Sequence, residues 1–226
     1  MINSSLVTTS KFPLQPSTDK GLWLVFDIET NGLFDDVTDT FCVVCHDLIN
    51  NQTHKFKPDQ VNQALQLLSK ADVLIGHNIL FYDLPVLNKL YKITFSARII
   101  DTLVCTRLIW PKEVLYDLDD ELYQQVPIAL KGSASLKAWG YRLSNHKIDF
   151  KDFSEYSQEM LDYCVQDVMV TCNLLKYIIR QNYSQPALKL EHEFAIFIQK
   201  QIREGIPFDI DAALDLVDVL RTKQTR

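Results

Sequence analysis

The apolar positions of the chain form short continuous runs in its first third. Strands are predicted over residues 21–29 (GLWLVFDIE), 40–48 (TFCVVCHDL) and 53–57 (THKFK). Only short turns separate these runs, which favours antiparallel hairpins. A fourth apolar run at residues 72–78 (DVLIGHN) predicts one further brief strand.

Helical spacing of apolar residues begins after the third predicted strand. Helices are predicted over residues 58–71 and 84–92, each with a proline in its first turn. Residues 98–110 (RIIDTLVCTRLIW) predict a strand followed by a helix. Further helices are predicted over 134–143, 154–181 and 186–205, and another begins after residue 206. The longest of these has an apolar stripe of Leu161, Val165, Val168, Cys172, Leu175 and Ile179.

This order of elements predicts an α/β protein with a mixed sheet and helices on its faces. Residues 111–133 are locally acidic and are predicted to be an irregular insertion. Residues 1–20 are polar and rich in Ser, Thr and Pro, which predicts a flexible tail. No glycine-rich strand-to-helix turn of the Rossmann or P-loop kind occurs, so chemistry on a nucleotide cofactor is not expected.

Composition narrows the class of protein. The chain has 226 residues, 47% hydrophobic and 23% charged, as in a soluble globular protein with a sizeable core. No apolar run approaches the roughly 18 residues that span a bilayer, so no membrane partner is expected. The formal net charge of −6 argues against a protein that coats long nucleic acid. This net charge is compatible with a protein that binds a few nucleotides or that holds metal with its acidic residues.

The five cysteines are odd in number and have no framework spacing, which favours reduced, buried thiols. Residues 42–46 (CVVCH) formally match a haem-attachment motif, and with His54 a zinc site is conceivable. Neighbouring side chains of a strand point to opposite faces, so these ligands are not expected to converge.

Candidate chemistry comes from carboxylates. Asp27 and Glu29 point to one face because the side-chain period of a strand is two. A polar strand end is the alternative for this pair. Asp83 precedes a predicted helix, where the alternative is a helix N-cap. Asp167 and Tyr163 lie four residues apart on the long helix and share a face. A satisfied, half-buried Asp is the alternative for Asp167.

The four carboxylates together indicate a metal site. Hard divalent cations such as Mg²⁺ prefer oxygen ligands. Two such ions about 4 Å apart activate water and stabilise the leaving oxygen in phosphodiester hydrolysis. Without metal, four gathered carboxylates would repel one another and raise each other's pKa.

The residues around these carboxylates resemble the three motifs of the DEDDy-type, DnaQ-like 3′–5′ exonucleases. The motifs are DIE with Leu33 four residues after Glu29, HN-x3-YD at 77–83, and Y-x3-D at 163–167. The strings IIDTLVCTRLIWP, LKAWGYRL, DYCVQDVMVT and REGIPFD resemble the proofreading exonuclease domain of phage family-A DNA polymerases. The likeness runs from about Gly21 to the end of the chain.

The resemblance implies an RNase H-like fold, a five-stranded mixed sheet flanked by helices, with LVFDIE as a central strand. Residues 21–183 would form the 3′–5′ exonuclease domain. Residues 184–226 would form a C-terminal helical segment similar to the link to a polymerase domain. The polymerase motifs do not follow, so no polymerase activity is expected of this chain.

The resemblance also implies two divalent metal ions, Mg²⁺ with Mn²⁺ as a substitute. Asp27, Glu29 and Asp167 would hold the more tightly bound ion. Asp27 would also reach the second ion, which Asp83 would hold largely through water. The product would be a deoxynucleoside 5′-monophosphate.

Tyr163 and Glu29 would orient the attacking water. A histidine at position 164 would be a stronger general base, but this chain has Cys164 there. Tyr163 therefore indicates the DEDDy subclass. A phenol, neutral near pH 7, positions water rather than removing its proton. A core aromatic is the alternative for Tyr163.

The substrate-binding residues implied by the resemblance are Thr30, Asn31, Leu33, His77, Asn78 and Tyr82. Leu33 would wedge against the terminal bases, with a core leucine as the alternative. His77 has a structural role as its alternative. Asp101 is interpreted as a helix N-cap, and Lys131, Lys137 and Arg142 would either meet phosphates or be solvated.

The implied partners are the 3′ end of single-stranded DNA and, as a candidate, a DNA polymerase domain or subunit. A cytoplasmic location is implied, in the host cell if the protein is phage-encoded. Ala134 replaces a histidine common in the relatives, so a DNA contact there is not expected. An exoribonuclease of the same superfamily and a non-catalytic domain of a split polymerase are the alternatives.

Overall fold

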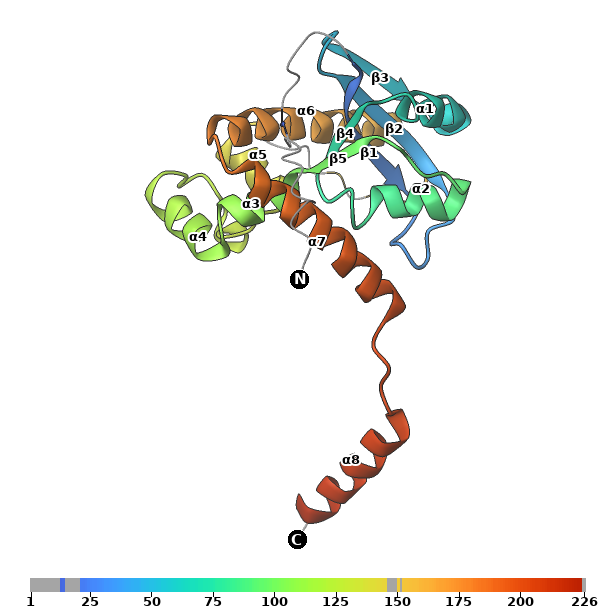
Figure 1. Ribbon diagram of the computed structural model, residues 1–226, viewed down its shortest axis with the longest axis vertical. Coiled ribbons are helices and arrows are strands. Elements are labelled where there is room, and N and C mark those ends of the chain that lie inside the picture. Colours follow the sequence, from blue (N-terminus) through green and yellow to red (C-terminus); the bar gives the residue numbers. More distant parts are fainter. Residues whose placement is uncertain (1–12, 15–20, 146–149, 151, 225–226) are drawn as a thin grey trace, which may run out of the picture.

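A computed structural model describes residues 13–14, 21–145, 150 and 152–224. Its centre is a five-stranded mixed sheet with helices on both faces (Figure 1). The strands are β1 (Trp23–Thr30), β2 (Thr40–Asp47), β3 (Gln52–Phe56), β4 (Val73–Gly76) and β5 (Arg98–Asp101). Their order is β3-β2-β1-β4-β5, so β1 is central. The first three strands pair antiparallel, and β4 and β5 continue the sheet in parallel with β1. The predicted fold class is confirmed.

The helices are α1 (Val61–Leu68), α2 (Asp83–Tyr91), α3 (Thr102–Ile109), α4 (Lys112–Glu121), α5 (Leu136–Arg142), α6 (Gln158–Arg180), α7 (Gln185–Glu204) and α8 (Ile210–Gln224). Two short 3₁₀ turns lie at Pro58–Gln60 and Ile128–Leu130. Helix α6 packs on β1 and β2 across one face of the sheet. Its predicted apolar stripe is confirmed, because every member is buried or half-buried.

Alternation along β1 separates the two faces of the sheet. Trp23 and Val25 belong to the core cluster shared with α6, whereas Leu24, Phe26 and Ile28 belong to the cluster with α1 and α2. With a side-chain period of two, Asp27 and Glu29 therefore face α6.

The same alternation in β2 argues against a haem-attachment or zinc site at residues 42–46. Cys42 lies in the core cluster with α6 and Cys45 in the opposite one, so the two thiols diverge. All five cysteines are free and buried, which confirms the prediction of reduced thiols.

The expected irregular insertion at 111–133 is wrong in part, because it contains α4. Leu115 is buried in the core cluster and Leu118 packs against it, at the spacing of one helical face. The acidic residues around them concealed this apolar face in the sequence.

Arg142 is likewise misassigned as a candidate phosphate contact. Its Nε and Nη2 donate to the two carboxylate oxygens of Asp119 on α4, both at 2.7 Å, and the pair is buried. Nη1 donates to Ser133 O at 2.7 Å. Arg142 therefore ties α5 to α4, and Lys131 forms an ion pair with Asp120.

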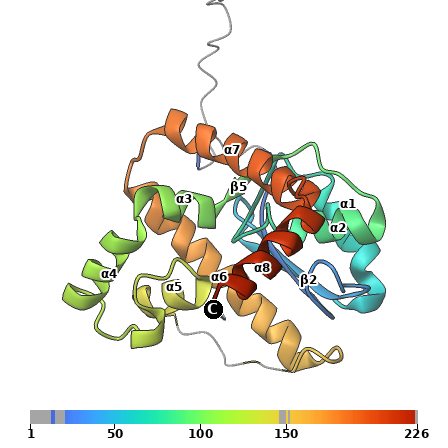
Figure 2. The ribbon, with the colours of Figure 1, turned by 90° about the horizontal axis from the view of Figure 1, so that it is seen from below.

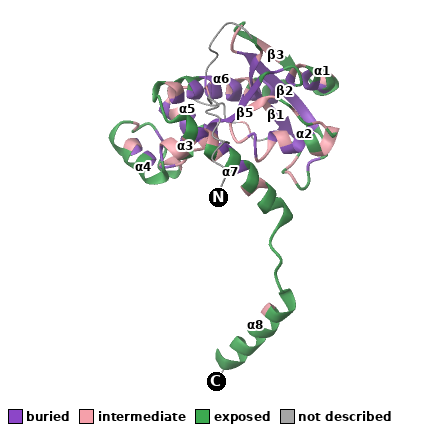
Figure 3. Ribbon diagram, viewed as in Figure 1, coloured by how far each residue is buried: buried purple, intermediate pink, exposed green. Residues whose placement is uncertain are grey.

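The two ends of the chain differ in how they meet the core. Leu14 is buried in the core cluster, while most of the predicted N-terminal tail lies outside the described residues. Helix α7 packs against α3 (Figure 2). Helix α8 stands apart from the rest of the fold (Figure 1). No residue of α8 is buried (Figure 3). Within the described ranges, no helix is long and apolar enough to cross a bilayer.

Candidate active site

The candidate residues gather at one edge of the sheet. Strands β1, β4 and β5 are parallel, so their carboxyl ends meet at that edge. The pairing of β1 with β2 is irregular between Glu29 and Thr30, where β1 leaves the sheet. The end of β4 comes so close that a Cβ on Gly76 would lie 2.9 Å from Phe26 O. Small backbone separation thus brings the loop after β4 beside Asp27.

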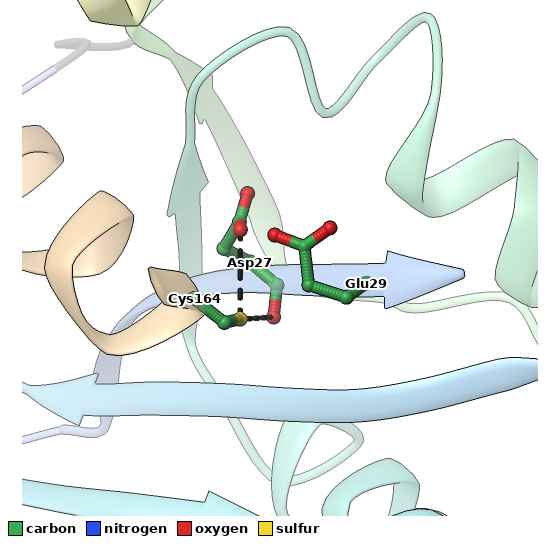
Figure 4. Close-up of side chains that lie close together, drawn as sticks. All are labelled: Asp27, Glu29 and Cys164. Carbon is green, nitrogen blue, oxygen red and sulfur yellow. Dashed lines mark hydrogen bonds between the residues drawn. The ribbon is translucent and has the colours of Figure 1, made fainter. Parts of the chain in front are cut away.

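Asp27 and Glu29 form the centre of the site (Figure 4). One oxygen of each carboxylate and the Cys164 sulfur of α6 all lie within 4.8 Å of one another. The Cys164 thiol lies 3.5 Å from both the backbone oxygen and Oδ2 of Asp27, and donates to this residue. Burial raises the pKa of Cys164 well above its usual value, and the charges of Asp27 and Glu29 add to the effect. A neutral thiol orients the Asp27 carboxylate rather than competing with it for a hard cation.

Asp83 joins the centre from α2. It is the first residue of that helix rather than its cap, so the N-cap alternative is wrong. Its Oδ1 accepts a hydrogen bond from Ile28 N, between Asp27 and Glu29, at 3.3 Å. Burial raises the pKa of Asp83 to about 7, and the charges of Asp101 and Asp167 act in the same direction. Backbone hydrogen bonds from Asp83 and Ile28 oppose this rise.

Asp167 and Tyr163 lie one turn apart on α6, and their shared helix face is the one predicted. Asp167 is buried, and its charge raises the pKa of Asp83. The Tyr163 ring packs near Phe150 and Phe153, with ring centroids 5.7 and 6.2 Å away. Asp162 is exposed and accepts from Gln158 at 3.1 Å, away from the cluster.

The loop after β1 presents a side chain to solvent. Leu33 is 77% exposed, so the core-leucine alternative is wrong. The Asn31 amide is occupied within the loop, donating to Thr38 Oγ1 at 2.7 Å and accepting from Thr38 N at 3.0 Å. Its backbone N–H also donates to Asp39 O, at 3.3 Å, so Asn31 shapes the loop.

Tyr82 connects this loop to α2. Its hydroxyl donates to Gly32 O at 2.6 Å and is hydrogen-bonded to Thr30 Oγ1. Burial raises the pKa of Tyr82 and the Thr30 hydrogen bond lowers it, while the charges of Asp83, Glu29 and Asp27 raise it further. Tyr82 and Thr30 thus lie beside the carboxylates.

Asp101 organises the loop that carries His77 and Asn78. The predicted N-cap is confirmed, because Oδ1 accepts from Leu103 N at 2.9 Å. The same carboxylate accepts from Asn78 N at 2.9 Å and Leu80 N at 3.0 Å. Asn78 has a positive φ of 69°, a conformation that asparagine tolerates and that local hydrogen bonds must hold.

Two further contacts complete this loop. His77 Nδ1 lies 2.9 Å from Thr102 Oγ1, whose hydroxyl donates to Gly76 O at 3.0 Å. Thr102 thus accepts from His77, in line with the structural alternative for that residue. The Asp101 N–H donates to Nε2 of buried His192 on α7, at 2.8 Å. No local pattern pointed to His192, because 91 residues separate it from Asp101 in sequence.

A cavity of about 450 Å³ adjoins the loop. Its lining residues are His77, Asn78, Leu103, Arg107, Trp110, Pro111, Lys112, Leu115, Gly132, Ser133, Ala134, Ser135 and Leu136. Arg107 and Lys112 are exposed and form no ion pair within the part of the chain that the structure describes. In a chain of net charge −6, these two cations make the cavity suitable for an anionic group.

The donor set fits a hard divalent cation. The Asp27 and Glu29 carboxylates lie together, and Asp83 retains its proton to about pH 7 because burial and neighbouring negative charge oppose ionisation. A bound cation would remove that opposition, and oxygen donors are those preferred by Mg²⁺ and Mn²⁺.

Two phage proteins are similar to this chain in sequence. The chain is 31% identical to the DNA-directed DNA polymerase of Enterobacteria phage T3 and 30% identical to that of Escherichia phage T7. Each match covers 89% of this chain and 36% of the polymerase. The chain thus spans about a third of the length of these relatives.

Solved structures share the fold. Brucella melitensis NrnC with bound Mg²⁺ has a TM-score of 0.52 at 16% identity, covering 86% of this chain and 92% of NrnC. The apo form of a nuclease has a TM-score of 0.51 at 18% identity, covering 84% and 89% of the two chains. A family model described as RNase_H superfamily matches residues 24–179, from β1 to the end of α6. On this match, together with the central β1 and its carboxylates, the chain belongs to the RNase_H superfamily.

Proposed function

We propose that the protein is a metal-dependent 3′–5′ exonuclease that releases deoxynucleoside 5′-monophosphates from the 3′ end of DNA. The observation that carries the proposal is the pairing of the Asp27 and Glu29 carboxylates at the end of β1, with Asp83 bonded to the Ile28 N–H between them and the charge of Asp167 acting on Asp83. Such a gathering of like charges is unfavourable unless a cation joins it. Similarity to two phage DNA polymerases supports a role in proofreading during phage-type replication.

The four carboxylates would hold two Mg²⁺ ions, for which Mn²⁺ would substitute. When bound, the ions would ionise a water molecule and stabilise the leaving 3′-oxygen. The chain itself contributes the position of the carboxylates. Ile28 N fixes Asp83 and the Cys164 thiol fixes Asp27, so little rearrangement is needed when metal and substrate arrive.

Tyr163 and Glu29 would orient the attacking water. A phenol ordinarily keeps its proton at neutral pH, so Tyr163 would act by donating a hydrogen bond rather than by removing a proton. Phe150 and Phe153 pack beside its ring and limit the positions that it samples. These contacts support a positioning role at the reacting phosphodiester.

Leu33 would contact the terminal bases from the loop after β1. Apolar contact with base faces tolerates any sequence, which proofreading requires. Thr30 and Tyr82 would border the terminal sugar, and the His77–Asn78 loop would guide the strand away. The cavity beside that loop would receive an upstream phosphate through Arg107 and Lys112.

A polymerase domain or subunit would cover the C-terminal helices. The exposed apolar residues of this segment are Leu190, Phe194, Ile196, Phe197, Ile202, Ile206, Phe208, Ile210, Leu214, Leu216, Val217, Val219 and Leu220. Exposed apolar surface of this extent marks protein interaction sites. Sedimentation together with a DNA polymerase is expected, and unaltered sedimentation would count against this partner.

Removal of one carboxylate should abolish stepwise DNA shortening. With 5′-labelled single-stranded DNA and Mg²⁺, the wild type is expected to give a ladder that shortens one nucleotide at a time. EDTA should abolish the ladder. Asp167→Asn is expected to slow it by roughly a hundredfold or more, because it removes one charge from the metal-binding set.

Asp162→Asn is the matched control, since it alters an exposed carboxylate of the same helix. It should leave the rate unchanged. Equal loss in both variants would contradict the assignment of Asp167. Shortening of an RNA strand alone would replace DNA by RNA as the substrate, and soluble, folded protein without any ladder would favour a non-catalytic domain.

Replacement of the two cavity cations should affect long substrates selectively. The Arg107→Gln, Lys112→Gln double variant is expected to raise the KM for a twelve-nucleotide strand about tenfold and to weaken its salt dependence. Hydrolysis of a dinucleotide, which does not extend into the cavity, should be unchanged. Lys70→Gln, on an exposed lysine beyond α1, is the control. An equal loss on both substrate lengths would contradict the upstream subsite.

A further inference from the structure

Helix α2 contacts the loop that presents Leu33 and holds it through Lys89. Lys89 Nζ donates to Phe34 O at 2.7 Å and to Asp35 O at 2.8 Å. The same ammonium lies 5.3 Å from the centroid of the Phe34 ring. Lys89 therefore holds both the backbone after Leu33 and the neighbouring aromatic side chain.

A second cation reaches the same loop from α7, far along the chain. The Arg203 guanidinium carbon lies 3.8 Å from the centroid of the Phe34 ring. Burial lowers the pKa of Arg203, and the charge of Asp35 raises it, which agrees with a cation seated between an aromatic ring and a carboxylate. The loop is thus held from two helices, by Lys89 and Arg203, which are 114 residues apart in sequence.

The internal bonds of the loop make Leu33 sensitive to these contacts. Leu33 O accepts from Asp36 N at 3.0 Å and from Val37 N at 2.8 Å, and Val37 is buried. Residues 33–37 therefore form a compact turn, anchored at Val37, with Phe34 next to the exposed Leu33. A shift of the Phe34 ring would be transmitted directly to Leu33.

We propose that Arg203, together with Lys89, is a positioning residue for the exonuclease reaction and sets the orientation of Leu33 at the terminal base pair or base. The proposal rests on the proposed function, in which Leu33 contacts the substrate. Arg203 touches no reacting atom and acts only through Phe34.

Helix α7 then supports the candidate site at two places. Its His192 binds Asp101, which holds the His77–Asn78 loop, and its Arg203 holds the loop of Leu33. One helix thus contacts both substrate loops, and α7 is also the helix that leads to the exposed C-terminal segment. A partner bound to that segment would act on the site through Arg203.

Hydrogen exchange of the loop tests the contact without any need for activity. Arg203→Ala is expected to increase exchange of the amides of residues 33–37 about two- to fivefold, the range of an exposed cation–π contact. Arg203→Lys should give a smaller increase, because an ammonium lacks the planar guanidinium. Lys200→Ala, on an exposed lysine of the same helix, should leave exchange unchanged. Equal exchange in wild type and Arg203→Ala would overturn the proposal.

Kinetics test whether Arg203 acts through Leu33. Arg203→Ala is expected to lower kcat for single-stranded DNA two- to fivefold with little change in KM and unchanged thermal stability. In a Leu33→Ala background, the same substitution should have no further effect on kcat. An additive loss in the double variant would overturn the proposal. If the wild type shortened no DNA, the proposed function would fail, while the hydrogen exchange result would still judge the contact.

Discussion

Repulsion between neighbouring buried carboxylates is the physical constraint on which the candidate site depends. Asp27 and Glu29 lie on the central strand, Asp83 begins α2 and Asp167 lies in α6, so no single element holds the set together. Burial raises the pKa of Asp83 to about 7, which means that near neutrality the folded chain keeps much of this carboxyl protonated. The core on either face of β1 supplies the free energy that keeps these charges together. A divalent cation would remove the repulsion and release the proton.

Backbone donors hold most of the surrounding loops. Asp101 accepts from three amides, two of them in the loop of His77 and Asn78. Asp101 is held in turn, because its backbone N–H donates to Nε2 of the buried His192. Such buried hydrogen-bonded groups are costly to disturb, because removing one partner leaves the other unsatisfied. The loop of His77 and Asn78 is therefore held on its inner side by hydrogen bonds, while the loop after β1 exposes Leu33.

Local pattern was sufficient for the elements with strong periodicity. The strands, the stripe of α6 and the cap at Asp101 follow from side-chain periods of 2 and 3.6 and from capping chemistry. Local sequence pattern failed to predict the role of residues whose contacts are made with partners far away in the sequence. Arg142 forms a buried ion pair with Asp119. Asp119 lies in α4, whose apolar face is masked in the sequence by the acidic residues around it. Asp83 bonds to a strand instead of capping its own helix, and the contacts of α7 with both loops involve partners too distant for any local pattern.

The most direct test of the account is Mn²⁺ binding measured by calorimetry at pH 6 and pH 8, in pairs of buffers with different ionisation enthalpies. Two bound ions are expected, with an affinity roughly tenfold weaker at pH 6 than at pH 8. Below about pH 7 Asp83 is mostly protonated, so binding at pH 6 should release nearly one proton and binding at pH 8 almost none. Asp83→Asn should abolish that proton release. Absence of binding, or an affinity independent of pH with no proton released, would contradict a metal site formed by these carboxylates.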